Sequence, residues 1–161
     1  MVIEPYHPSR LEAIVRLSLR AWAPVFASLE AAMGPAVYRA FYRDDWRAAQ
    51  QRAVEAVCAD SSLHVFVAAV DPATTAGFMA LKLHPDDRMG EIYMIAVDPE
   101  YQRRGIATRL IDHAVDWFRK AGLSIAMVET GGDPGHGPAR RTYEAAGFRL
   151  LPVARYFKDL T

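Results

Sequence analysis

The chain has 161 residues, 52% of them apolar and 24% charged, with 19 Lys and Arg against 19 Asp and Glu. This length and composition predict one soluble globular domain over residues 1–161. The balanced charge gives no reason to expect nucleic acid as a partner. The single cysteine, Cys58, excludes an intrachain disulfide and a cysteine-based metal cluster, and the five histidines lack the spacing of metal ligands. We therefore expect no metal.

Apolar runs in the sequence are too short for a membrane protein. None approaches the roughly 20 residues that a transmembrane helix requires. The N-terminal segment 1–6 lacks a basic stretch followed by an apolar one, so it does not resemble a signal peptide. We therefore expect a cytoplasmic protein without a membrane partner.

The first half of the chain alternates short strands with helical periodicity. Ser9 and Glu12 match a capping box, which predicts a helix that Pro24 ends. A second helical region follows, with a break at Gly34-Pro35. In chain order, the predicted elements are a strand, two helical regions and two antiparallel strands, over residues 2–4, 9–22, 28–59, 63–70 and 76–83.

The second half predicts a parallel β-α-β unit over residues 91–129, which should be right-handed. A glycine-rich loop, a short helix from Pro138 to Gly147 and one or two closing strands within 148–157 follow. The element order predicts an α/β protein of the α+β type. We expect a mixed six- to seven-stranded sheet with helices on both faces.

The central feature of the sequence is the turn between the strand 91–97 and the helix that follows. Asp98-Pro99 stops the strand, and a short basic turn with one glycine, Gly105, opens the helix. Backbone N–H groups and the positive end of a helix dipole meet at such a turn, and together they bind phosphate. The turn lacks the Gly-Lys-Ser/Thr of a Walker loop and the three glycines of a dinucleotide-binding fingerprint.

Two segments carry a resemblance to a known family. Residues 102–107, Gln-Arg-Arg-Gly-Ile-Ala, match the pattern Gln/Arg-x-x-Gly-x-Gly/Ala, and residues 139–148, Ala-Arg-Arg-Thr-Tyr-Glu-Ala-Ala-Gly-Phe, follow at a suitable distance. Together they resemble the GNAT superfamily of acyl-CoA-dependent N-acyltransferases. The resemblance implies the single-domain acyl-CoA N-acyltransferase fold, with acetyl-CoA as co-substrate and direct transfer of the acetyl group to a primary amine.

The resemblance also implies which residues bind the cofactor. The backbone of the central strand, at Ile95, Ala96 and Val97, would pair with the pantetheine arm. The pyrophosphate would lie on the turn, and His136 and Arg140 would bind nearby. The turn residues are Gln102, Arg103, Arg104, Gly105, Ile106, Ala107 and Thr108. His136 stands where many family members carry asparagine. A basic turn exposed to water is the alternative interpretation.

Acyl transfer from a thioester to an amine requires an acid for the departing thiolate and a base for the amine. Tyr143 matches the tyrosine that serves as general acid in many family members; the alternative is a ring packed in the core. Glu91 is the candidate base, and a solvated carboxylate at the start of a strand is the alternative. Glu129, His136 and water are further candidates for the base.

The sequence contains no clear signal for the acceptor. In the family, the first helices and the late strands build the acceptor pocket, so Trp22, Phe26 and Tyr93 would line it; ordinary core packing is the alternative. A small-molecule amine and a protein N-terminus both stay open as acceptors. A non-catalytic acyl-CoA sensor on the same fold is the alternative function, and a homodimer is also compatible with the sequence.

Overall fold

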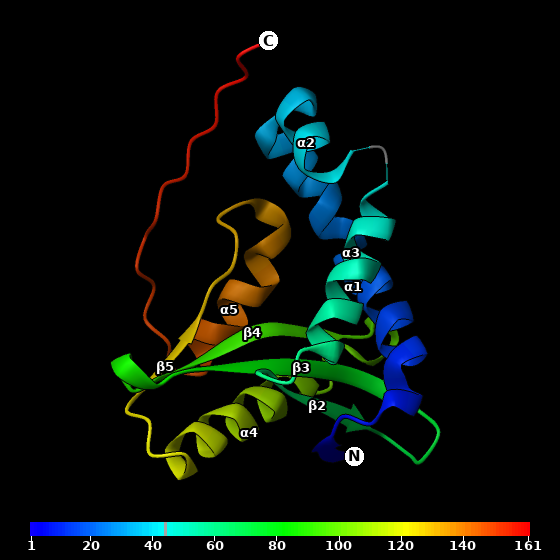
Figure 1. Cartoon of the computed structure of the whole chain (residues 1–161), viewed down its shortest axis with the longest axis vertical. Coiled ribbons are helices and arrows are strands. Elements are labelled where there is room, and N and C mark those ends of the chain that lie inside the picture. Colours follow the sequence, from blue (N-terminus) through cyan, green and yellow to red (C-terminus); the bar gives the residue numbers. More distant parts are fainter. Residues whose placement is uncertain (44) are drawn as a thin grey trace.

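The computed structural model describes residues 1–43 and 45–161 and contains a five-stranded mixed sheet (Figure 1). The strands lie in sequence order and are antiparallel except for the last pair, β4 and β5, which is parallel. This confirms the mixed sheet and the parallel β-α-β unit. The strands are β1 (Val2–Pro5), β2 (His64–Ala69), β3 (Thr75–His84), β4 (Met89–Val97) and β5 (Ile125–Val128).

Helices cover both faces of the sheet, as the sequence predicts. Helix α4 lies against one face, and α1 and α3 lie on the other side (Figure 1). The helices are α1 (Leu11–Met33), α2 (Pro35–Tyr42), α3 (Trp46–Ala59), α4 (Ile106–Lys120) and α5 (Gly137–Ala145). Within the described part of the chain, no helix is long and apolar enough to cross a membrane.

Each face of the sheet has its own apolar cluster. On the α4 face, Ile106, Leu110, Ala114 and Phe118 recur every fourth residue and are buried with the sheet residues Met79, Leu81 and Ile92. On the opposite face, the α1 and α3 residues Ile14, Leu17 and Val54 are buried with Val67, Phe78 and Ala96. The sheet is therefore held between two cores, and its central strands contribute to both.

The prediction that Pro24 ends the first helix is wrong. Helix α1 continues through Pro24 to Met33, where Gly34 at φ +78° ends it. Proline removes one backbone hydrogen bond from a helix interior. Tertiary contacts beyond Pro24 compensate for this loss, because Phe26 is 5% exposed and stacks on Trp46 of α3 with ring centroids 4.4 Å apart.

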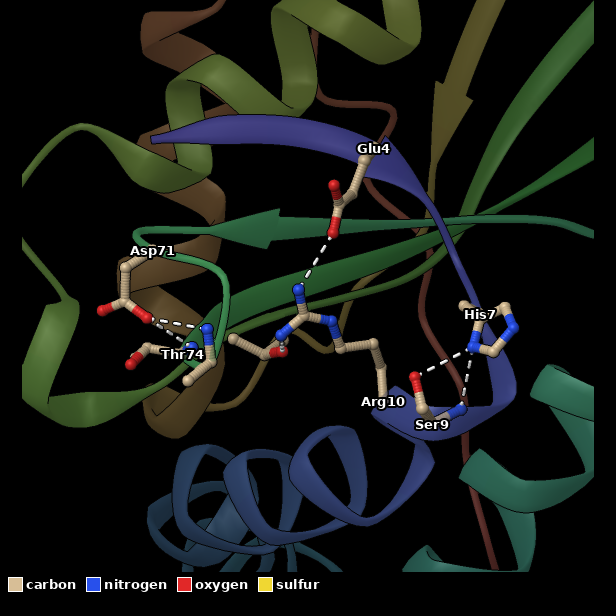
Figure 2. A network of polar contacts seen from close by, with 8 residues as sticks. Glu4, His7, Ser9, Arg10, Asp71 and Thr74 are labelled. Atoms are coloured by element: carbon tan, nitrogen blue, oxygen red, sulfur yellow. Dashed lines mark hydrogen bonds and ion pairs between the residues drawn. The ribbon is translucent and has the colours of Figure 1, made fainter.

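The start of the first helix also differs from the prediction. A short 3-10 turn, Pro8–Arg10, precedes α1, and the backbone N–H of Ser9 donates to Nδ1 of His7. Figure 2 shows this contact beside the Arg10 guanidinium, which reaches back to Glu4 of β1 at 3.1 Å. Ser9 therefore does not form the capping box. The helix is anchored to the sheet by Arg10 instead.

The helical region after Gly34 contains a second break, which the sequence does not predict. The predicted break at Gly34-Pro35 is confirmed, but α2 ends at Tyr42 and α3 begins only at Trp46. The Asp45 carboxylate accepts hydrogen bonds from the N–H groups of Arg47 and Ala48 and so acts as the N-cap of α3.

The closing strands predicted within residues 148–157 do not form, so the sheet has five strands rather than six or seven. Residues 149–161 extend away from the body past the level of α2 (Figure 1), and all of them are exposed. We call this segment the C-terminal tail. Its apolar composition is typical of a strand, but strand composition stabilises a structure only against a partner strand.

We expect Gly90→Ala to destabilise the protein, because a Cβ at Gly90 would overlap the buried Phe118 ring of α4. Overpacking of this kind costs about 1–3 kcal/mol of unfolding free energy, which urea denaturation measures. Gly132→Ala is the matched control, since a Cβ there meets open space. Equal stability of the two variants would contradict the packing of β4 against α4.

Candidate functional site

The site is built around a gap between β4 and β5. Their parallel pairing ends at Ile92 and Val128, although β4 continues to Val97. A bulge lies at the same place, because Ala80 pairs with Met94 while the next residue of β3, Leu81, pairs with Ile92. Tyr93 is therefore the extra residue of β4, and beyond it the strand has no partner on its β5 side within the described chain.

The predicted pantetheine residues lie along this open edge. Ile95, Ala96 and Val97 direct their side chains into the two cores, and Ala96 and Val97 are only 7% and 8% exposed. The N–H and C=O groups on the β5 side of this segment have no strand partner among the described residues. Such an edge binds an extended ligand that contains amides, as a further strand would.

At the end of β4, the chain forms the turn that the sequence predicts as an anion site. Residues 102–105 are exposed, and Arg103 and Gly105 have positive φ angles of 61° and 75°. Residues in this conformation turn successive backbone N–H groups toward one point. No side chain caps the N-terminus of α4. The N–H groups of Ile106, Ala107 and Thr108 are therefore not engaged by a cap and suit an anion.

Gly105 suits its position in the turn, because its backbone lies in the left-handed region at φ +75°, which side chains disfavour. The Gln102 side chain also has a structural role, since its amide donates to the Val97 carbonyl at 3.0 Å and holds the turn against the end of β4.

A buried carboxylate fixes this turn to the rest of the protein. Asp98 is 2% exposed, accepts a hydrogen bond from the N–H of Glu100 and is paired with the Arg20 guanidinium of α1. Its own N–H donates to the Ala76 carbonyl of β3 at 2.9 Å. The predicted strand stop is thus also the anchor between α1 and the anion-binding turn, which the sequence pattern alone did not indicate.

A groove of about 330 Å³ runs between the N-terminal turn of α4 and helix α5. Thr108 lines it from α4, and Arg141 and Thr142 line it from α5. The predicted ligand Arg140 is not among the lining residues, because its guanidinium donates to the Gly131 and Asp133 carbonyls and holds the preceding loop. Of the two neighbouring arginines, Arg141 is therefore the one placed to meet a phosphate in the groove.

Tyr143 lies on α5 in the same apolar cluster as Val97 and Ile106. It is 9% exposed, and its ring meets the Phe148 ring edge-on at a centroid distance of 6.2 Å. Burial raises the pKa of the Tyr143 hydroxyl to about 12. The hydroxyl therefore keeps its proton throughout the neutral range, as a general acid must.

Glu91 lies near the start of β4, on the face opposite to α4. Its neighbour Gly90 faces Phe118 of α4, and successive residues of a strand point to opposite faces. The Glu91 carboxylate is hydrogen-bonded to Nε2 of His84 at 2.7 Å and is 15% exposed. No local sequence pattern indicates His84 as the partner of Glu91, because the contact depends on the pairing of β3 with β4.

The loop before α5 is joined to α1. The Ser28 hydroxyl of α1 donates to the Asp133 carboxylate at 2.6 Å, and the Gly135 N–H donates to the same hydroxyl at 2.8 Å. Asp133 also contacts Nδ1 of His136. Burial raises the pKa of Asp133, but hydrogen bonds from Ser28 and His136 outweigh it, and the pKa lies below its ordinary value. Nδ1 of His136 is thus engaged within the loop.

The aromatic residues predicted for the acceptor pocket differ in their placement. Phe26 is buried between the helices against Trp46 and Tyr42, so it supports the fold and does not line an open surface. Trp22 is partly buried against the α1–α3 core. Tyr93, the bulge residue, is 48% exposed, with the Lys82 ammonium 5.7 Å from its ring centroid.

Comparison with known proteins agrees with this geometry. The family model "Acetyltransferase (GNAT) family" matches residues 31–148, which include β2 to β5, the anion-binding turn and the whole of α5. The chain belongs to the GNAT acetyltransferase family. Metal-binding groups of three or more His, Cys, Asp or Glu side chains are absent from the described residues of this family member.

Relatives of the chain are acetyltransferases by name. The uncharacterized N-acetyltransferase YsnE of Bacillus subtilis is 35% identical over 52% of this chain and 56% of its own length. The [ribosomal protein bS18]-alanine N-acetyltransferase of Escherichia coli is 31% identical over 44% of this chain and 46% of its own length. The chain thus spans about half the length of these two relatives.

A solved structure shows the same fold. The aminoglycoside N-acetyltransferase AAC(6')-Iy, in complex with CoA, superposes with a TM-score of 0.65 at 17% identity. The alignment covers 99% of this chain and 95% of that one. At this identity the likeness concerns the fold alone.

We expect Thr108→Glu to weaken binding of CoA, because it places a carboxylate in the groove beside the uncapped N-terminus of α4. A loss of about tenfold in affinity corresponds to roughly 1.4 kcal/mol, and isothermal titration calorimetry measures it. Ser124→Glu, an exposed substitution beyond the other end of α4, is the matched control and should bind as the unaltered chain does. Equal affinities of the two variants would place the phosphates elsewhere.

Proposed function

We propose that the protein is an N-acetyltransferase that moves an acetyl group from acetyl-CoA directly to a primary amine. The observation that carries this proposal is the continuity of the open edge of β4 with the anion-binding turn. An extended arm that contains amides and ends in a pyrophosphate matches both features in their order along the chain. Family membership supports acetyl-CoA as the co-substrate.

The residues of the site divide into backbone and side-chain contributions to acetyl-CoA binding. We assign the pantetheine arm to the backbone of residues 95–97 and the pyrophosphate to the backbone N–H groups of residues 103–108. Arg103, Arg104 and Arg141 supply positive charge at the exposed turn and in the groove. Gln102, Arg140 and His136 act indirectly, because their side chains hold the turn and the loop in shape.

Transfer of the acetyl group requires the amine to attack the thioester carbonyl and the C–S bond to break. We assign Tyr143 as the general acid that gives its proton to the departing thiolate sulfur. The hydroxyl is protonated at neutral pH and so has a proton to give, and the position of Tyr143 in the same apolar cluster as Val97, at the end of the open β4 edge, supports this role. No acyl-enzyme is required, and Cys58, whose thiol pKa is raised by burial, is unsuited to be a nucleophile.

We assign Glu91 as the general base that removes the proton from the attacking amine, directly or through a water molecule. The hydrogen bond to His84 supports this role because it fixes the direction of the carboxylate. The Glu91 side chain keeps a 15% exposed fraction, so water can reach it. Glu129, the alternative base, lies just beyond the end of β5. Its side chain is 77% exposed, and Arg155, with which it forms an ion pair, is exposed as well.

Both classes of acceptor stay open within this proposal. The Escherichia coli relative is named for the alanine of a ribosomal protein, and the enzyme with the same fold is named for an aminoglycoside. We place the amine on the Glu91 face of β4, where the exposed Tyr93 ring and Trp22 of α1 are the aromatic candidates. A screen of peptide N-termini and small amines, following release of free CoA thiol, identifies the acceptor.

We expect Tyr143→Phe to lower the turnover number by about 10²–10⁴-fold, the usual contribution of a positioned general acid. Affinity for acetyl-CoA should not change, because the ring is kept. Thiol release and calorimetry measure the two quantities. Tyr42→Phe, a substitution on α2, is the matched control. An unchanged turnover number would remove Tyr143 from the reaction, and absence of transfer to any amine by the unaltered chain would instead indicate an acyl-CoA sensor.

We expect Glu91→Gln to lower the turnover number. The glutamine keeps a partner for His84 but cannot accept a proton, and loss of a general base costs about 10²–10⁴-fold. The measurement is the rate of thiol release with saturating acetyl-CoA and a saturating amine. Glu129→Gln is the control, and a larger effect there than at Glu91 would transfer the base to Glu129.

A further inference from the structure

Lys82 lies beside the proposed base, on the side of the sheet where α1 and α3 lie (Figure 1). In the antiparallel pair of β3 and β4, it stands directly opposite Glu91. Two residues in this relation point to the same face of a sheet, with their Cβ atoms about 5 Å apart. His84, two residues further along β3, shares this face and is hydrogen-bonded to Glu91. A primary amine and a histidine therefore flank the proposed base.

The Lys82 side chain extends toward the gap between β4 and β5. Its ammonium group lies 5.7 Å from the centroid of the Tyr93 ring. Tyr93 is the bulge residue that follows the last residue of β4 paired with β5, and it is 48% exposed. Under the proposed function, the pantetheine arm runs from the anion-binding turn along residues 97 to 95, so its thioester end lies toward Tyr93. The Lys82 amine is thus on the path to the thioester.

The Lys82 ammonium is only loosely held within the described part of the chain. It forms none of the ion pairs found there. Hydrogen bonds from Ser62 lower the pKa of Asp60, and the Lys82 charge contributes to this shift. A cation over an exposed aromatic ring is stabilised by about 0.5–1 kcal/mol. The amine can therefore leave the Tyr93 ring at a small cost in free energy.

The other lysines of the chain lie in other elements. The chain has three lysines, and Lys82 alone belongs to the strands that build the site. Lys120 is the last residue of α4, and the length of this helix places it about 21 Å along the axis from the anion-binding turn. Lys158 belongs to the C-terminal tail. Both are exposed, so they report the reactivity of an ordinary surface lysine.

We propose that Lys82 is a site of autoacetylation: without an external amine, the protein transfers the acetyl group from bound acetyl-CoA to its own Lys82 nitrogen. This inference rests on the proposed function. After the ammonium has released a proton to solvent, the neutral nitrogen attacks the thioester carbonyl, a C–N bond forms and the C–S bond breaks. Glu91 takes the second proton from the nitrogen, and Tyr143 gives a proton to the departing sulfur. The products are Nε-acetyllysine and free CoA, and no further reactant is needed.

The test incubates the full chain with acetyl-CoA that carries an isotopically labelled acetyl group, without any added amine. Peptide mass spectrometry measures the label at each lysine. We expect Lys82 to be labelled at least about tenfold faster than Lys120 and Lys158, because a nucleophile held beside the thioester reacts faster than one that must first meet it. The rate constant should not depend on protein concentration. An unacetylated Lys82, equal labelling of the three lysines, or a rate constant that rises with protein concentration would overturn the proposal.

Variants separate catalysed transfer from chemical acetylation. Lys82→Arg keeps the positive charge but removes the amine, so position 82 should take up no label while calorimetry gives unchanged affinity for CoA. Lys120→Arg is the matched control and should leave labelling of Lys82 unchanged. Tyr143→Phe and Glu91→Gln should each slow the labelling of Lys82 to the rate of Lys120, since both remove a proton transfer from the reaction. Labelling of Lys82 that responds to neither substitution would contradict autoacetylation.

Failure of this inference is distinguishable from failure of the proposed function. If the chain acetylates an external amine but not Lys82, autoacetylation is wrong and the acetyltransferase assignment stands. If neither Lys82 nor any amine of the screen is acetylated, the proposed function is wrong as well.

Discussion

The early end of pairing between β4 and β5 is the constraint on which the site depends. Strand β5 ends at Val128, opposite Ile92, and the bulge at Tyr93 follows directly, while β4 continues to Val97. A bulge generally bends its strand and increases the local twist. A buried strand edge without a partner is costly. The open edge is therefore better understood as a binding surface than as a defect.

Helix α1 connects the two sides of this opening. Arg20 binds Asp98 at the end of β4, and Ser28 binds Asp133 in the loop before α5. Eight residues of helix separate them, which corresponds to about 12 Å along its axis. The continuity of α1 through Pro24 makes this spacing rigid. A helix that ended at Pro24 would leave the anion-binding turn and the helix that carries Tyr143 without a common support.

Local chemistry explains which features the sequence could predict. The anion-binding turn and helix α4 depend on residues close together in the chain. Gly105 was enough to predict the turn, and apolar residues at every fourth position were enough to predict the helix: Ile106, Leu110, Ala114 and Phe118. The roles of His84, Ser28 and Asp98 depend on partners from 7 to 105 residues away, which no local pattern records.

Tertiary contacts explain the structural predictions that failed. Pro24 is a typical helix end, but the stack of Phe26 on Trp46 compensates for it and α1 continues to Met33. The tail has the composition of a strand, but the only described edge on its side of the sheet is β5. In both cases the outcome depends on contacts between residues far apart in the chain, which local residue type does not specify.

The two proposed catalytic residues lie on opposite faces of the sheet. Tyr143 belongs to the core on the α4 side, whereas Glu91 points to the opposite face, where α1 and α3 lie. The gap beyond Ile92 is where β4 lacks a neighbour, so an acyl group held along that edge is accessible from both faces. The acid would then meet the sulfur from the cofactor side while the base meets the amine from the other. In the proposed mechanism this arrangement would keep the two proton transfers apart, and it depends on the bulge in β4 and on the end of β5 at Val128.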